Sequence, residues 1–309
     1  MQTTSNLLMI RPVNFKFNQQ TANNNKFQKA SDQENIHDKA VQEFDRFVNT
    51  LRENDLEIIV IDDTLKPETP DSIFPNNWIS LHEDGLAIRY PMFSENRRLE
   101  RREDILNQLK TNFTINNLID LSHYEKTGAY LEGTGSLVLD RENKIAYACQ
   151  SIRTDVRVLK EFCLQTGYRS IIFNAVDLDG FPIYHTNVMM CLATQFVVIC
   201  MDAIANNEEK NTLKETFSST GKEIIEISYE QMNHFAGNML QVKNIKNELL
   251  LIMSQQAYLS LSTEQIAKLQ KYNRIVTSPI DTIEKIGGGS ARCMLAEIHL
   301  YKRGDSTFL

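Results

Sequence analysis

The sequence lacks any long apolar run. The apolar run near the N-terminus covers residues 7–10, and the best later one covers residues 196–201. Both have the length of a strand, whereas a membrane-spanning helix needs about 20 apolar residues and a signal peptide has its own apolar core. We therefore expect a cytoplasmic protein that neither crosses nor binds a membrane.

An excess of positive charge is also missing. The chain has 33 Lys and Arg against 40 Asp and Glu, a formal net charge of −7. This balance disfavours non-specific attraction to nucleic acid or to an anionic lipid surface. The sequence therefore predicts no nucleic-acid partner.

Cysteine pairs are absent as well. The five cysteines form no C-x-x-C motif, which argues against a disulfide framework and against a zinc site. The histidines other than His185 show no i, i+4 pair suited to a metal ion. We expect no metal centre.

No linker rich in Ser, Gly or Pro divides the 309 residues, so we expect one domain over residues 1–309. The composition, 42% hydrophobic and 24% charged, is that of a soluble globular protein. A capping box at Ser31–Glu34 and apolar residues at helical spacing predict a helix over 32–53, followed by a strand at 56–61.

The same order recurs along the chain. Pairs of apolar strands are each followed by a helix and a further strand, which gives five α/β units in all. The strand pairs are expected near 77–90, 134–149, 187–201 and 238–253; the helices at 97–111, 153–166, 206–218 and 262–271, the last with a capping box at Ser262–Gln265; and the closing strands at 115–121, 169–175, 222–227 and 273–277.

Chemically capable residues stand at the starts of these units: Asn77, Glu132, His185, Asn238 and Cys293. Successive members are separated by 55, 53, 53 and 55 residues. In a ring of repeated units, equivalent positions face one another around the axis. The spacing therefore predicts one central cleft that contains a carboxylate, an imidazole and a thiol.

Cys293 and His185 are the residue types of a nucleophile and its base, with Glu132 as the group that orients the imidazole. Cys293 follows three glycines and Ser290-Ala291-Arg292, a loop that allows close approach of backbone and ligand. Taken singly, each residue also has an ordinary structural reading. Cys293 can be an inert thiol in a flexible turn, and Asn76-Asn77 can be turn formers after Pro75.

Taken together and in order, these motifs resemble the guanidino-group-modifying superfamily, which includes arginine deiminase, dimethylarginine hydrolase and amidinotransferase. The motifs are Asp71-x-x-Phe74 with Asn76-Asn77, Leu131-Glu132-Gly133-Thr134-Gly135, Ser151-Ile152-Arg153-Thr154, His185-Thr186-Asn187 and the run from Gly287 to Cys293. The opening Arg11-Pro12-Val13-Asn14-Phe15 is similar to the citrulline hydrolase branch. The resemblance spans essentially the whole chain.

The resemblance implies a pentein fold, a fivefold pseudosymmetric α/β propeller, and a covalent thiol mechanism without a cofactor. It implies Cys293 as nucleophile, His185 as general acid/base and Glu132 as its orienting carboxylate. Asp71 and Arg153 match positions that hold the α-ammonium and α-carboxylate of an amino-acid substrate. Arg97 or Arg98 is implied as an assisting residue.

Two departures from the family pattern concern the substrate. Relatives that act on a guanidinium carry acidic residues at the positions of Asn77 and Asn187. A buried carboxylate suits a cation, whereas an amide offers both a donor and an acceptor to a neutral ureido group. We therefore expect a hydrolase that converts citrulline into ornithine, carbon dioxide and ammonia, with Asn76, Asn77 and Asn187 at the reacting end.

Two alternatives are left open. One is a guanidinium hydrolase of the arginine deiminase or dimethylarginine hydrolase type, which the two asparagines disfavour. The other is a non-catalytic pentein that binds a macromolecule, for which Cys293, His185 and Glu132 would be surplus and the net charge a poor match to RNA.

Overall fold

Five three-stranded sheets form the framework of the chain. The computed structural model describes residues 1–22, 24–31 and 34–304. In each sheet the middle strand pairs antiparallel with one neighbour and parallel with the other. The sheets are β3 (Ile79–Leu81), β4 (Leu86–Arg89) and β5 (Asn117–Asp120); β6 (Val138–Asp140), β7 (Ile145–Cys149) and β8 (Arg169–Phe173); β9 (Met190–Leu192), β10 (Phe196–Ile199) and β11 (Glu223–Glu226); β12 (Leu240–Lys243), β13 (Leu249–Ser254) and β14 (Arg274–Ser278); and β15 (Ala296–Glu297), β1 (Asn6–Arg11) and β2 (Glu57–Asp62).

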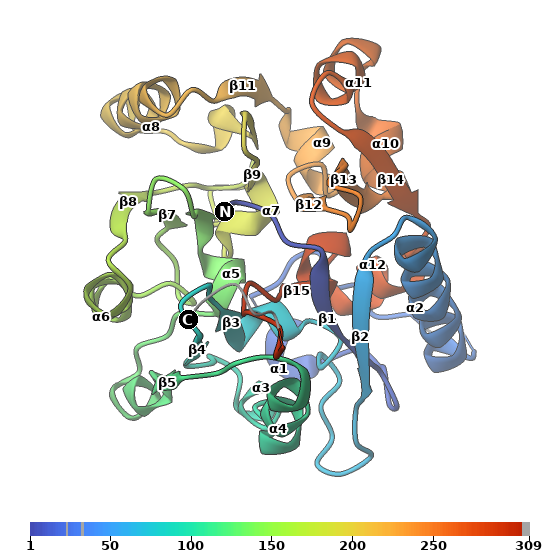
Figure 1. The fold of residues 1–309 in the computed structure, drawn as a ribbon. Helices are drawn as coiled ribbons and strands as arrows, with labels where there is room; N and C mark the ends of the chain where they lie inside the picture. The colour runs from blue at the N-terminus through green and yellow to red at the C-terminus, as the bar shows by residue number, and fades with distance from the viewer. Residues whose placement is uncertain (23, 32–33, 305–309) are drawn as a thin grey trace.

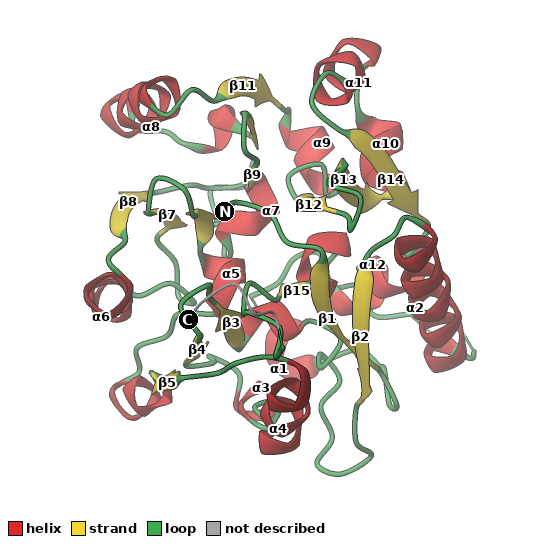
Figure 2. Ribbon diagram, in the orientation of Figure 1, coloured by secondary structure: helices red, strands yellow, loops and turns green. Residues whose placement is uncertain are grey.

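Each parallel pair requires a crossover connection, and helices provide it. Figure 2 shows these helices on the outside of the molecule, with the strands nearer the middle. The crossover helices are α2 (Ile36–Glu53), α4 (Glu103–Asn112), α6 (Val156–Thr166), α8 (Asn207–Ser219) and the pair α10 (Gln255–Ser260) and α11 (Thr263–Gln270).

The fifth sheet joins the two ends of the chain. β15 pairs antiparallel with β1, Leu7 opposite Glu297 and Leu8 opposite Ala296. The five ββαβ units therefore lie around a common centre (Figure 1). The predicted α/β pentein architecture is confirmed.

A short helical turn precedes the first strand in four of the five units, so those strands begin later than predicted. The turns are η1 (Pro75–Asn77), α5 (Gly133–Ser136), α7 (Thr186–Met189) and η4 (Ala291–Met294). In the remaining unit Asn238 follows α9 (Tyr229–Asn233) in a loop. The predicted unit starts thus lie in or next to short helical turns, and in one case in a loop, just before the first strand of each sheet. The other short helices are α1 (Gln19–Ala22), α3 (Glu95–Arg98), α12 (Asp281–Gly287), η2 (Ser122–Thr127) and η3 (Met201–Ala203).

The predicted capping boxes have different outcomes. Ser262 and Gln265 form the expected box at the start of α11. The box at Ser31–Glu34 does not begin α2, although residues 32 and 33 lie outside the described part of the chain. That helix begins at Ile36 after Asn35, whose backbone is left-handed (φ 61°). A left-handed residue interrupts helical geometry, so α2 begins later than predicted, while the predicted start at residue 32 itself lies outside the described residues.

The predicted helix over 97–111 is divided into α3 and α4. Arg97 and Glu100 are both buried and form a bidentate ion pair with distances of 2.8 and 2.9 Å. This pair holds the chain in a turn between the two helices, because it keeps both charged side chains inside the molecule.

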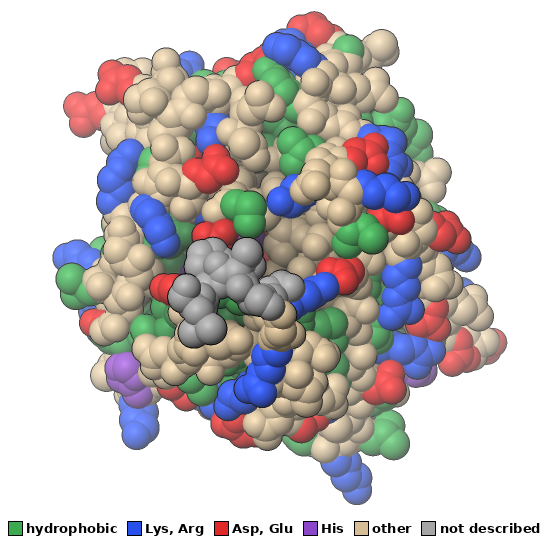
Figure 3. All heavy atoms as spheres, in the orientation of Figure 1, with side chains coloured by type: hydrophobic (Ala, Val, Ile, Leu, Met, Phe, Trp, Pro, Cys, Tyr) green, Lys and Arg blue, Asp and Glu red, His purple; other side chains and the backbone are tan. Residues whose placement is uncertain are grey.

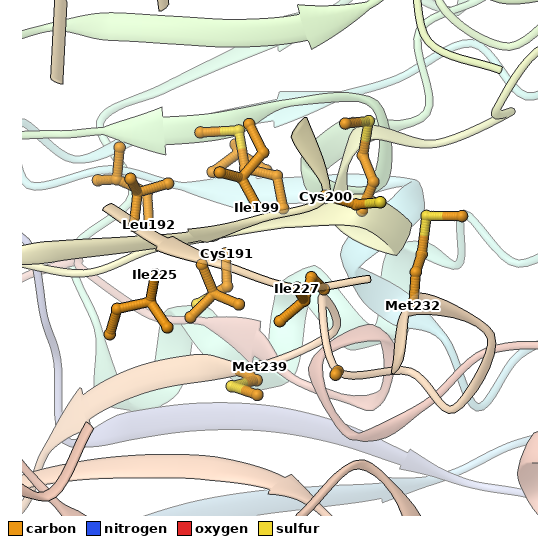
Figure 4. Packing of buried hydrophobic residues seen from close by; sticks show 14 of the residues in the cluster. Cys191, Leu192, Ile199, Cys200, Ile225, Ile227, Met232 and Met239 are labelled. Carbon is orange, nitrogen blue, oxygen red and sulfur yellow. The ribbon is translucent and has the colours of Figure 1, made fainter. Parts of the chain in front are cut away.

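Apolar side chains fill the space between the sheets and helices. In α2, Ala40, Phe44, Phe47, Val48 and Leu51 are buried at the helical spacing seen in the sequence. Figure 4 shows part of another cluster, in which Cys191, Cys200, Met232 and Met239 pack among aliphatic residues of the third unit.

Four of the five cysteines have a raised thiol pKa because of burial. Burial raises the pKa of Cys149 and of Cys191 to about 12, and that of Cys200 to about 11. Cys163 is half-buried on α6, and all five thiols are free. These four thiols are therefore poor nucleophiles at neutral pH.

The surface carries charges of both signs. On the face shown in Figure 3, Lys and Arg side chains are interspersed with Asp and Glu. Among the described residues, none of the helices combines the length and apolar character that crossing a bilayer demands.

Candidate active site

The structure brings the five unit-start residues together. Asn238 Nδ2 lies 3.2 Å from Cys293 Sγ, and His185 Nε2 lies 2.8 Å from Glu132 Oε2. Asn77 and His185 both pass close to Gly135: a Cβ atom built there would lie 2.2 Å from Asn77 Nδ2 and 2.9 Å from His185 Cε1. All five side chains are at least 94% buried.

Glu132 is held as a carboxylate. Its Oε1 accepts a hydrogen bond from Phe93 N at 2.9 Å, and Oε2 receives His185 Nε2–H and Arg153 Nη1 at 3.3 Å. Burial alone would raise the pKa of Glu132, but the positive charge of Arg153 and the hydrogen bond from His185 hold it well below its ordinary value. The ionised carboxylate fixes the tautomer of His185, since Nε2 must donate and Nδ1 keeps its lone pair.

His185 is neutral at neutral pH. Burial lowers the pKa of its imidazole to about 4, although Glu132 opposes the shift. A neutral ring with a free Nδ1 lone pair can accept a proton from a thiol and deliver it later to a leaving group. Among the described residues, the side-chain hydrogen-bond partners of Cys293 are the amides of Asn187 and Asn238 rather than His185.

The glycines before Cys293 allow close packing of the loop. A Cβ atom at Gly289 would lie 2.9 Å from Phe74 Cε1 and 3.3 Å from Cys293 Cβ, and Gly288 has a left-handed backbone (φ 67°). The carbonyl of Gly288 accepts hydrogen bonds from Tyr184 Oη at 3.0 Å and from Asn25 Nδ2 at 3.2 Å. The sequence predicts that other groups approach this loop closely. In the structure, Phe74 and Asn25 are such groups.

Two amides lie at the reacting end. Asn77 Oδ1 accepts a hydrogen bond from Arg97 Nη1 at 3.2 Å, and Asn187 Nδ2 lies 3.5 Å from Cys293 Sγ. The other side-chain atoms, Asn77 Nδ2 and Asn187 Oδ1, are buried and make no hydrogen bond within the described residues. An unpaired buried polar atom costs about 1–3 kcal/mol, so these atoms mark places for ligand groups.

Asp71 and Arg153 contact the N-terminal segment, residues 18–22 and 24–28. Asp71 Oδ2 accepts hydrogen bonds from Asn18 Nδ2 at 2.8 Å and Thr21 Oγ1 at 3.0 Å, while its Oδ1 has no partner among the described residues. Arg153 Nε donates to Asn24 Oδ1 at 3.0 Å. This segment therefore covers the residues expected to hold the amino-acid end of a substrate.

Three expected site residues have other surroundings. Arg97 donates hydrogen bonds to Glu100, to Asn77 and to the Phe74 carbonyl, so it orients the Asn77 amide. Arg98 points to the carbonyls of residues 92 and 93 and to Glu125. The Asn76 side chain is fully buried, and neither of its polar atoms has a partner within the described residues. Its backbone carbonyl accepts a hydrogen bond from Thr134 Oγ1 at 3.3 Å.

A cavity of about 1090 Å³ lies beside this cluster. Asn24 and Phe27 of the N-terminal segment line it, together with Tyr184 and Glu284, whereas Cys293 and Glu132 do not. Since Asn24 also contacts Arg153, the N-terminal segment touches both this cavity and a residue of the buried cluster.

Some residues of the site were not predicted. Glu284 is buried, accepts a hydrogen bond from Ser290 Oγ at 2.5 Å and also contacts Gln256. Through Ser290, Glu284 stabilises the loop that carries Cys293. Glu100 and Asn24 were missed likewise, because no repeat or motif marks them and only the folded chain brings them to their partners.

Replacement of Gly135 by alanine is expected to lower turnover by about 10–100-fold, because the added methyl must displace Asn77 or His185 by a large part of an ångström. Steady-state kinetics of the purified variant measure this. Gly128→Ala is the control, since nothing lies within 4 Å of a Cβ there and only a backbone penalty of about 1–2 kcal/mol is expected. Equal turnover in both variants would contradict the packing described.

Glu284 gives a pH-dependent contribution to stability. Burial raises its pKa to about 7 from 4.5, so the native state binds the proton more tightly than the unfolded state does. The free energy of unfolding relative to Glu284→Gln should be highest below pH 4.5. It should then fall by up to about 3 kcal/mol as the pH rises to about 7. Urea unfolding of both proteins across this range tests it, and a constant difference would refute the shift.

The model of the family described as N,N dimethylarginine dimethylhydrolase, eukaryotic, matches residues 11–300. The chain belongs to this family. Membership of the dimethylhydrolase family confirms the predicted guanidino-group-modifying superfamily and the predicted class, hydrolases of carbon–nitrogen bonds. It does not distinguish the citrulline branch. Comparison with curated proteins gives no match.

Solved structures share the fold of this dimethylhydrolase family member. Apo ArgZ, an arginine dihydrolase from the ornithine-ammonia cycle in cyanobacteria, has a TM-score of 0.75 at 16% identity over 97% of this chain. The chain spans 41% of that protein's length. An ArgZ N-terminal domain bonded covalently to a reaction intermediate has a TM-score of 0.74 at 16% identity, with 95% of this chain and 97% of that domain covered.

A dimethylarginine dimethylaminohydrolase carrying an adduct with S-methyl-L-thiocitrulline has a TM-score of 0.64 at 16% identity. The match covers 96% of this chain and all of that one. At this level of identity the likeness concerns the fold, and the pentein prediction is confirmed by it.

Proposed function

We propose that this protein hydrolyses the ureido group of citrulline through a covalent Cys293 intermediate. The observation that supports it is the pair of amides at the reacting end. Asn77 Nδ2 and Asn187 Oδ1 are buried without partners in the described part of the chain. One is a donor and the other an acceptor.

The orientation of the Asn77 amide follows from its neighbour. Arg97 can only donate, so the Asn77 atom that faces it must be Oδ1, and Nδ2 must point the other way. A ureido group has a carbonyl oxygen for this donor and an NH₂ group for Asn187 Oδ1. A guanidinium has only N–H donors and would oppose Asn77 Nδ2 with another donor.

The groups that contact the thiol are neutral. Its hydrogen-bond partners among the described residues are the amides of Asn187 and Asn238. A guanidinium placed against these amides would gain no counter-ion from them for its lost hydration, which disfavours arginine relative to citrulline.

The proposed reaction begins with proton transfer from the Cys293 thiol to neutral His185 through a water or substrate group bound between them. The thiolate attacks the ureido carbon and forms a tetrahedral intermediate. His185 then gives its proton to the departing nitrogen, and the carbon stays bonded to sulfur. Water, deprotonated by His185, attacks this carbon and releases the thiol. Loss of carbon dioxide from the carbamate completes the reaction: citrulline and water give ornithine, carbon dioxide and ammonia.

The amino-acid end of the substrate is proposed to bind Asp71 and Arg153. Asp71 Oδ1 is unpaired within the described residues and suits an α-ammonium group. Arg153 suits the α-carboxylate once it gives up its contact with Asn24. The N-terminal segment contacts both Asp71 and Arg153, so substrate binding and the position of that segment are coupled.

A second candidate is hydrolysis of a guanidinium, as in arginine or dimethylarginine. The comparisons favour it, because the matching family is named for dimethylarginine and the solved relatives include an arginine dihydrolase. The amides at Asn77 and Asn187 favour citrulline instead.

Product analysis separates the two candidates. The purified protein is incubated with citrulline, arginine or dimethylarginine, and ornithine, citrulline and ammonia are quantified, with Cys293→Ala as a blank. We expect ornithine and ammonia from citrulline. Citrulline formed from either guanidinium substrate, with no turnover of citrulline itself, would establish the second candidate.

A further inference from the structure

Asn238 contributes a polar side chain to the cluster from the fourth unit. It is 1% exposed, and its side chain makes four contacts, the longest of them from the Cys293 thiol to Oδ1 at 3.6 Å. Its Nδ2 lies 2.9 Å from the Asn187 carbonyl oxygen and 3.2 Å from Cys293 Sγ, and its Oδ1 accepts from Arg292 N at 3.0 Å.

These partners fix which way the amide points. The backbone N–H of Arg292 can only donate, so the atom facing it is Oδ1. The backbone carbonyl of Asn187 can only accept, so the atom facing it is Nδ2. One hydrogen of Nδ2 is used by that carbonyl, which leaves the second hydrogen for the sulfur.

We propose that Asn238 is a catalytic residue that stabilises the thiolate of Cys293 through this N–H group. The proposal rests on the nucleophilic role proposed above for Cys293. An ordinary thiol has a pKa of about 8.5 and is mostly protonated at neutral pH, so attack on a neutral ureido carbon needs surroundings that favour the anion. Hydrogen bonds to the charged form provide such a preference.

The arrangement suits this role better than the other contacts of the sulfur do. Asn187 Nδ2 is farther away, at 3.5 Å, and the Oδ1 of its amide has no hydrogen-bond partner among the described residues. His185 is engaged with Glu132 and makes no hydrogen bond to Cys293 in the described structure. Asn238 is thus the closest and most firmly oriented donor to the sulfur.

A structural role is the alternative, since Asn238 Oδ1 also holds the backbone beside Cys293. Asn238→Asp separates the two roles. It keeps the shape and the acceptor for Arg292 N, but it replaces the N–H donor to the sulfur and to the Asn187 carbonyl with a carboxylate oxygen that repels a thiolate. Asn238→Ala removes both contacts.

The experiment measures ionisation of the thiol without substrate. The ultraviolet absorbance of the thiolate is titrated in each protein, and the signal of the same protein with Cys293→Ala is subtracted. We expect the midpoint to rise by about one pH unit in Asn238→Ala and by more in Asn238→Asp. The value of kcat at pH 7 should fall by about 10–100-fold, with a smaller change in KM and partial recovery at higher pH for Asn238→Ala.

Asn206→Asp is the matched control, because Asn206 caps α8 on the surface and aspartate caps equally well. It should change neither the midpoint nor kcat. An unchanged midpoint in Asn238→Asp would overturn the proposal. If circular dichroism shows that only the Asn238→Ala variant is folded, an unchanged midpoint in that variant would overturn it instead. Failure of the proposed function is a separate result, since it would appear as absence of citrulline turnover while the titration still reports on Asn238.

Discussion

Replacement of Cys293 by serine is expected to lower citrulline turnover by at least about 10⁴-fold. A serine hydroxyl is far harder to deprotonate than a thiol, and neither the neutral His185 nor the two amide donors around the sulfur compensate for this difference. Serine is smaller but otherwise similar in shape, so the fold should be retained.

Steady-state kinetics and thermal unfolding of the purified variant measure both parts of this expectation. Cys163→Ser is the control, because Cys163 is a half-buried thiol on α6 away from the cluster. It should keep full activity. Turnover of Cys293→Ser near that of the unmodified protein would remove the covalent mechanism.

The double substitution Asn77→Asp with Asn187→Asp is expected to change ligand preference. One new carboxylate oxygen would face Arg97 as Asn77 Oδ1 does, and the remaining oxygens would face the reacting group. Arginine brings a cation to them, whereas citrulline brings only a neutral group. We expect the ratio of citrulline affinity to arginine affinity to fall by about 10³-fold, or about 4 kcal/mol.

Calorimetric titration of both ligands into the Cys293→Ala background measures this ratio. Asn206→Asp in the same background controls for the added surface charge. We do not expect an active arginine deiminase, because catalysis requires the reacting carbon to be placed within a fraction of an ångström. An unchanged affinity ratio would show that these asparagines do not select the substrate.

Much of the architecture could be predicted because it repeats. The five units and their order follow from alternating apolar strands and amphipathic helices, and the spacing of 53–55 residues placed Asn77, Glu132, His185, Asn238 and Cys293 at equivalent positions. The structure places these side chains in one cluster. Their catalytic roles stay predictions.

Features that depend on contacts between distant segments were missed. The pairing of Arg97 with Glu100 ended a helix that periodicity alone would continue, and α2 begins after the left-handed Asn35 rather than at the capping box that the sequence predicts. The N-terminal segment over Asp71 and Arg153 has no periodic pattern either, since its role depends on single hydrogen bonds such as the one between Asn24 and Arg153.

Competition between citrulline and arginine tests the proposed function most directly. The protein is given equal amounts of both in two parallel tubes. Citrulline carries ¹³C at the reacting carbon in one tube and arginine carries it in the other, and the label is followed by nuclear magnetic resonance. We predict that label from citrulline moves into bicarbonate while label from arginine stays in arginine. Label from arginine that moves into citrulline or bicarbonate at an equal or greater rate would contradict a site built for the neutral ureido group.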